Sequence, residues 1–269
     1  ESERPTLRMN RRLLLAAGCL AVLALTSGCL GIGTGPVSED ALDSDPAEPY
    51  AWETDRAAHI TVQENTQFRA VMDVNRSTVD LFRRDGFGGS SPLSVEAVRY
   101  RYPNGTIITG SEFRERGGAV RETKDETVVE LPPGTDRKGT LAFTSSGTPK
   151  RFTLPTYVDG TYEVVLPENR DIDFPVFGQV SPGNYETIRD DRGRVKIVWA
   201  EPVTADTVSV RYYLQRDLYI FAGVLGAIVL VGIGGLLYRR RQIERLRKQR
   251  LEMGVDVDTN DDDEPPGLG

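Results

Sequence analysis

Cysteine is the most reactive side chain in this sequence, and both cysteines, Cys19 and Cys29, lie in the apolar N-terminal stretch. Cys29 closes Thr26-Ser27-Gly28-Cys29, which has the form of a lipobox: small residues let a peptidase reach the backbone, and the cysteine then carries a lipid. Thr26 departs from this pattern, because an aliphatic residue is usual there, and the run ending at Cys19 is a weaker second match. We expect lipidation at Cys29, with an uncleaved signal-anchor helix as the alternative.

The single histidine, His59, stands between Ala58 and Ile60, and no cysteine follows Cys29. The common zinc sites need several His, Cys or carboxylate ligands, and the G-x-S-x-G turn that presents a nucleophilic serine is absent. Carboxylates are numerous, but no local signature selects a pair of them for glycoside hydrolysis. The sequence therefore predicts no catalytic, cofactor-binding or metal-binding residue, and we expect the protein not to be an enzyme.

Two sequons carry the other chemistry that the sequence offers. Asn75-Arg76-Ser77 and Asn104-Gly105-Thr106 match the acceptor pattern for N-glycosylation. Asn104 is the better candidate, because Pro103-Asn104-Gly105 is typical of an exposed turn. We expect a glycan on at least one of them if this part of the chain faces outward.

The N-terminal stretch that contains the cysteines has the layout of a signal peptide. Residues 9–29 begin with Met9, pass through a basic pair at Arg11 and Arg12 and an apolar run, and end in small residues. Residues 1–8 are interpreted as an extension from a wrongly assigned start site. The arginine pair also fits a twin-arginine export signal.

A second apolar stretch predicts one transmembrane helix at residues 217–238. Leu218 to Tyr238 is free of charged residues and at 1.5 Å per residue reaches about 32 Å, enough to cross a bilayer core. The basic run that follows predicts that residues 239–269, basic and then acidic, are cytoplasmic, with the preceding body extracellular. Ala222 and Gly226 have the spacing of helix-pairing motifs, so a homodimer through this helix is one possibility.

The stretch between the two apolar ends reads as mainly β. Residues 30–57 are rich in Gly, Pro and acidic residues and predict a flexible tether. Short alternating runs rich in Val, Ile, Thr, Tyr and Phe then follow, which is typical of an antiparallel β-sandwich. Val95 to Ile108 predicts a hairpin, and only Gly110 to Gly118 has helical character. A break near Gly147 to Pro155 favours two small β modules, residues 58–149 and 150–216, over a single sandwich.

The composition bounds the function. The net charge is -7, which disfavours binding to nucleic acid, since that needs a basic face. Of 33 basic residues, only 5 are lysine, and this arginine-rich acidic balance favours a salt-adapted organism.

Four segments together resemble a haloarchaeal family of membrane-associated lipoproteins of unknown function: the signal, the stretch from Lys150 to Thr187, the closing "VSVRYYLQRDLYIF" and the basic tail. The resemblance implies no catalytic residue and no cofactor. We expect a cell-surface protein that binds or scaffolds at the envelope, with membrane lipid and an envelope protein or glycan as partners. The alternative is a signal-transducing or accessory subunit of a membrane complex.

Overall fold

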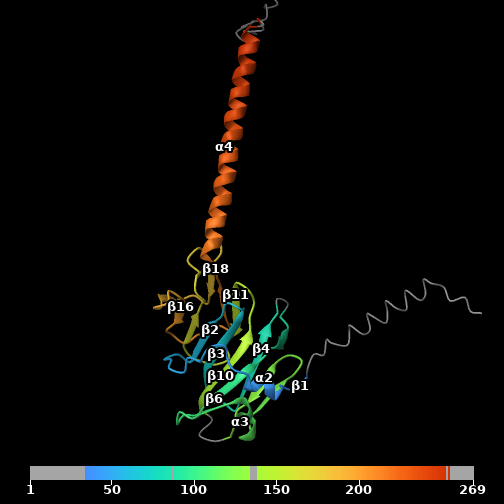
Figure 1. The fold of residues 1–269 in the computed structure, drawn as a ribbon, viewed down its shortest axis with the longest axis vertical. Coiled ribbons are helices and arrows are strands. Elements are labelled where there is room, and N and C mark those ends of the chain that lie inside the picture. Colours follow the sequence, from blue (N-terminus) through green and yellow to red (C-terminus); the bar gives the residue numbers. More distant parts are fainter. Residues whose placement is uncertain (1–33, 86–87, 134–137, 253, 255–269) are drawn as a thin grey trace, which may run out of the picture. The chain divides into compact units, whose positions relative to one another are not determined.

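The computed structural model describes residues 34–85, 88–133, 138–252 and 254, which contain a β domain and one long helix (Figure 1). These belong to two compact units, Glu1–Tyr213 and Leu214–Gly269. The predicted signal peptide, Cys19, Cys29 and the acidic tail lie outside the described residues. The prediction of a mainly β protein with antiparallel sheets and one long apolar C-terminal helix is confirmed.

An eight-stranded sheet forms the centre of the β domain, in the order β15-β16-β12-β2-β3-β10-β6-β7. Its strands are β2 (Ala58–Val62), β3 (Gln67–Val74), β6 (Glu96–Arg101), β7 (Ile107–Ile108), β10 (Gly139–Ser146), β12 (Tyr162–Val165), β15 (Glu186–Arg189) and β16 (Val195–Trp199). All neighbours are antiparallel except β12 and β2, which pair in parallel with Glu163 opposite His59.

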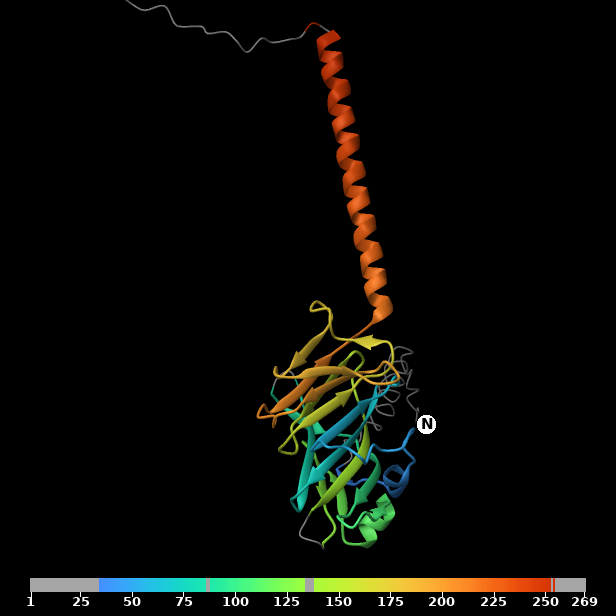
Figure 2. The same ribbon diagram turned by 90° about the vertical axis from the view of Figure 1, so that its left-hand side faces the viewer.

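Three smaller sheets complete the domain, and in the side view the strands lie in layers (Figure 2). The five-stranded sheet is β1 (Gly35–Pro36), β8 (Ala119–Glu122), β9 (Thr127–Glu130), β4 (Thr78–Arg84) and β5 (Ser90–Pro92). The three-stranded sheet is β11 (Arg151–Pro155), β17 (Thr207–Arg211) and β14 (Gln179–Ser181), and β13 (Arg170–Asp171) pairs with β18 (Tyr213–Leu214).

One apolar core joins the eight-, five- and three-stranded sheets. It contains Ile60 and Phe68 from the eight-stranded sheet, Leu81 from the five-stranded sheet, and Phe152 and Val210 from the three-stranded sheet. The predicted division into modules at residues 149–150 is corrected by this core, because strands from both sides of that point share it and pair within one sheet.

The predictions that depend on neighbouring residues, a hairpin and a short helix, are confirmed. The hairpin is confirmed, since β6 pairs with β7 and the backbone N–H of Gly105 donates to the carbonyl of Tyr102 across the turn. The helical character at Gly110 is confirmed as α3 (Gly110–Glu115), which begins with a capping box of Thr109 and Glu112.

The predicted tether is wrong for residues 34–57, which we call the strap. The strap contains β1 and α2 (Glu39–Asp43), and α2 packs against β6 and α3 (Figure 1). Leu42 is fully buried and Tyr50 nearly so. The Tyr50 hydroxyl donates to the carbonyl of Ala97, where β6 bulges with a φ of 53°.

Arginine side chains of the β domain hold the strap in place. Each of four arginines donates to a strap carbonyl and also pairs with a nearby strap carboxylate, which satisfies backbone groups that form no sheet. The pairs are Arg114 with Val37 and Glu39, Arg99 with Ser44 and Asp45, Arg69 with Pro49 and Glu48, and Arg101 with Trp52 and Glu53. The tether was mispredicted because these partners are distant in sequence.

The long helix, α4, spans Gln215–Glu252. By length and composition its part from Gln215 to Arg250 could cross a membrane, with a mean hydropathy of 2.5 in its most apolar window. At 1.5 Å per residue its 38 residues reach about 57 Å, longer than a bilayer core. The predicted apolar span and the basic run after it thus form one continuous helix.

Candidate functional site

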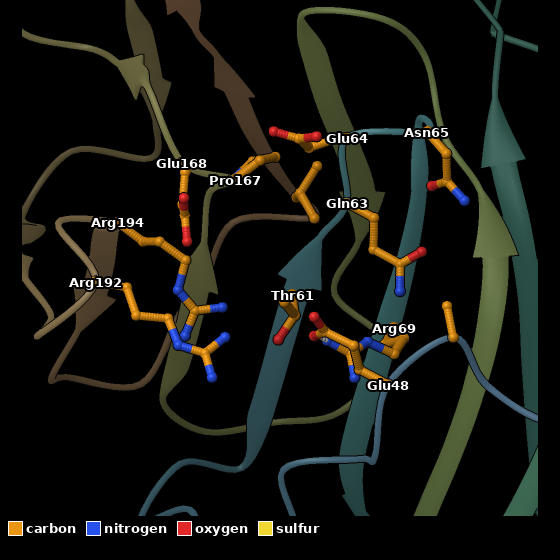
Figure 3. A pocket seen from close by; sticks show the side chains of 12 residues that line it. Glu48, Thr61, Gln63, Glu64, Asn65, Arg69, Pro167, Glu168, Arg192 and Arg194 are labelled. Atoms are coloured by element: carbon orange, nitrogen blue, oxygen red, sulfur yellow. Dashed lines mark hydrogen bonds and ion pairs between the residues drawn. The ribbon is translucent and has the colours of Figure 1, made fainter.

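A polar groove lies on the face of the eight-stranded sheet that points away from the shared core. Two adjoining cavities, of ≈ 470 and ≈ 630 Å³, share Glu48, Thr61, Arg69, Arg192 and Arg194 in their linings. The strap forms one wall with Glu48, and the turn between β15 and β16 forms the other with Arg192 and Arg194 (Figure 3).

The alternation of side chains along the strands determines which residues form the floor of this groove. In β2, Ile60 and Val62 enter the core, so His59, Thr61 and the following Gln63 face the opposite side. Register then places Arg69 of β3 opposite Thr61, and Val165 of β12 beside both Thr61 and Lys196. The floor is therefore polar, although it lies within the largest sheet of the domain.

A charge network occupies the middle of the floor. Glu163 is 8% exposed, its Oε1 lies 2.9 Å from Nζ of Lys196, and its Oε2 lies 3.8 Å from Nδ1 of His59. The neighbouring His59 imidazole and the Lys196 ammonium lower the pKa of Glu163 to about 2, against burial, which acts to raise it. This carboxylate is therefore a buried anion at neutral pH, stabilised by its neighbours.

His59 also lies 3.2 Å from Thr61, through Nε2 and Oγ1, so a hydroxyl, an imidazole and a carboxylate follow one another across the floor. A nucleophilic triad has this order. The 3.8 Å between His59 and Glu163 exceeds a hydrogen bond, however, and Glu163 lies closer to Lys196. The geometry favours a structural charge network over an activated hydroxyl.

Several buried polar atoms of the described residues beneath the groove have no hydrogen-bond partner. Within the described residues, no hydrogen bond reaches Nδ1 of His59, Nε of Arg69, or Nε2 and Oε1 of Gln63. All three residues line the groove. Most buried polar groups in proteins are hydrogen-bonded, so these atoms keep bonding capacity that ordered water, or a ligand toward which the side chains turn, would satisfy.

The predicted modification sites lie apart from this groove. Asn75 and Asn104 are both exposed, in the turns between β3 and β4 and between β6 and β7. The Asn104 side-chain oxygen accepts the backbone N–H of Thr106. Cys29 lies outside the described residues. Where the chain is described, no cluster of three or more His, Cys, Asp or Glu side chains is arranged to hold a metal ion.

Reasoning from the sequence missed the groove residues other than His59. Polar residues at alternate positions of a strand are ordinary on a solvent-facing sheet, so Thr61 and Gln63 carried no special signal. One wall comes from the strap, which was expected to be unstructured, and the other from a turn more than 120 residues later. The feature that marks this site is the burial of two charged residues, Arg69 and Glu163. That burial is visible only in the folded structure, so the sequence could not reveal it.

A protein-family model described as a family of unknown function (DUF5803) matches residues 54–258, which include every strand from β2 onward and the whole of α4. A search of curated proteins gave no match.

Proposed function

Because the chain belongs to the DUF5803 family of unknown function, its role must be inferred from its own residues, and we propose that it is a membrane-anchored binding protein. In this proposal α4 crosses the cell membrane, the β domain faces outward, and the groove binds a glycan of the cell envelope. The proposal includes no catalytic step.

The observation that carries the binding role is the cluster of unsatisfied polar atoms under an open groove. Sugars present alternating donors and acceptors, and the groove offers a hydroxyl from Thr61, an amide from Gln63 and carboxylates from Glu48 and Glu168. A groove with this mixture of polar groups suits a polyol better than an apolar partner.

The position of basic residues at one end of α4 supports the outward orientation of the β domain. Arg239, Arg240 and Arg241 follow the apolar part of α4 directly, and an excess of basic residues marks the cytoplasmic end of a membrane helix. The β domain precedes the helix in the chain, so it would lie on the outer side.

The proposal also includes a lipid on Cys29, a glycan on Asn75 or Asn104, and a haloarchaeal source, supported by the lipobox, the exposed sequons and the arginine-rich acidic composition. A lipid would act with α4, because a single acyl anchor binds membranes only marginally. Intact mass of the protein from native membranes, with a Cys29→Ser control, tests the lipid: an unmodified N-terminus would refute it. Bare Asn75 and Asn104 peptides would refute the glycan.

Binding is tested with the full chain in lipid nanodiscs and fluorescently labelled oligosaccharides released from the envelope of the producing cells. We expect saturable binding that weakens roughly five- to tenfold in Thr61→Val and in Gln63→Ala, since each loses a hydrogen bond of about 1 kcal/mol or more. Ser91→Ala, an exposed hydroxyl on β5, is the matched control. Absence of binding, or equal affinity in all four proteins, would contradict the proposal.

The second candidate function is a signal-transducing or accessory subunit. Its supporting observation is that β18 ends at Leu214 and α4 begins at Gln215, so no linker residue separates strand from helix. Pairing of α4 with a second copy would belong to this role. Deleting residues 239–269 distinguishes the two candidate functions. If cells with the truncated protein behave like wild type while cells without the β domain do not, only the binding role remains.

A further inference from the structure

The turn between β15 and β16 has a well-anchored backbone and presents two arginines to the groove. Asp190 anchors this turn, because its Oδ1 accepts the backbone N–H of Arg192 at 3.0 Å and of Arg194 at 2.8 Å. Gly193, between them, has a φ of 73°, which few other residues adopt without strain. Figure 3 shows both guanidinium groups directed into the groove, toward Thr61.

Arg192 and Arg194 are less neutralised by carboxylates than the other basic residues of the groove. Arg69 is paired with Glu48 at 2.6 Å, and Lys196 with Glu163 at 2.9 Å. Arg194 pairs with Asp190 only through Nε, at 2.8 Å, and no ion pair of Arg192 occurs among the residues whose structure is described.

Among the described residues, the cationic groups of the groove that remain without a carboxylate partner are the terminal nitrogens of Arg194 and the guanidinium of Arg192. Both lie on one wall, and the other two, Arg69 and Lys196, are in ion pairs. Guanidinium groups bind carboxylates through two parallel hydrogen bonds, a geometry that a lysine cannot provide.

We infer that the groove selects an acidic sugar, whose carboxylate is bound by Arg192 and Arg194. This inference rests on the proposed glycan-binding function and names its class of ligand, a uronate-containing glycan. The sugar hydroxyls then meet Thr61 and the amide of Gln63, while Glu168 at the rim accepts from a hydroxyl.

The test compares two probes of equal size, tetragalacturonate and its fully methyl-esterified form, binding to the full chain in nanodiscs. We expect the acid to bind at least tenfold more tightly than the ester. Arg192→Ala should weaken binding of the acid about tenfold and leave the affinity for the ester unchanged. Arg194→Lys keeps the charge but loses the planar fork, so it should weaken the acid several-fold. Arg211→Ala, an exposed arginine on β17, is the matched control.

The outcomes separate this inference from the function beneath it. Equal affinity for acid and ester, or an unchanged affinity in Arg192→Ala, overturns the inference. If envelope oligosaccharides bind while tetragalacturonate does not, the acidic-sugar inference fails and the glycan-binding proposal stands. If neither binds, both fail.

Discussion

Replacing Glu163 by glutamine is expected to lower the free energy of unfolding by about 3 kcal/mol at pH 7. The buried carboxylate balances Lys196 and His59, and removing one partner of a buried charge pair leaves the other uncompensated. The pKa of Glu163 gives the same magnitude, since it is about 2 in the folded chain against an ordinary value of 4.5, at 1.36 kcal/mol per unit.

The sign of the pH dependence follows from that lowered pKa. The folded state holds the proton less tightly than the unfolded state, so the stabilisation is complete above about pH 4.5 and is lost as the pH falls toward 2. The wild type and Glu163→Gln should therefore converge in stability near pH 2. Denaturant unfolding followed by the fluorescence of Trp52 and Trp199 measures the difference, with the exposed Glu186→Gln on β15 as control. A constant difference across this range would contradict the assigned role of Glu163.

Replacing Arg99 by alanine is expected to lower the free energy of unfolding by about 2–4 kcal/mol and to release the strap. Arg99 donates to the carbonyls of Leu42, Asp43 and Ser44 at 3.2 to 3.3 Å, and its side chain is 13% exposed. Carbonyls left buried without a donor cost about 1–3 kcal/mol each, less where water can reach them.

Release of the strap has a separate readout. A glutamyl endopeptidase should cut Arg99→Ala after Glu53 faster than it cuts the wild type, because Glu53 lies in the strap and is followed by Thr54. Arg99→Lys should restore little, since an ammonium cannot span three carbonyls as a guanidinium does. The control is Arg76→Ala, whose only described ion pair is with the fully exposed Asp159 at 3.9 Å. Unchanged cleavage in Arg99→Ala would show that the strap is held by other contacts.

The parts of the fold that depend on neighbouring residues were predictable. Alternation in "HITVQ" and "SVEAVRYRY" gave β2 and β6, Pro103-Asn104-Gly105 gave the turn between β6 and β7, and the uncharged run from Leu218 gave the apolar part of α4. In each case the residues that decide the structure lie within a few positions of one another.

The parts that depend on distant residues were not predictable. Leu42 and Tyr50 are isolated apolar residues in a polar segment, and the arginines that fix the strap come from strands and a helix about 20 to 80 residues later. The parallel pairing of β2 with β12 joins residues about 100 positions apart, and it creates both the single core and the contact of His59 with Glu163. The groove could not be predicted from local sequence for the same reason, because its walls are the strap and a turn far away in the chain.

Outward display of the β domain is the central claim, and site-directed labelling with a membrane-impermeant maleimide tests it most directly. Ser91→Cys places a thiol on β5, and Gln249→Cys places one in the basic part of α4; both positions are exposed. The unsubstituted chain measures labelling at Cys19 and Cys29. We predict that Ser91→Cys reacts in intact cells and that Gln249→Cys reacts only after the cells are broken. Labelling of Gln249→Cys in intact cells, with Ser91→Cys protected, would contradict the account.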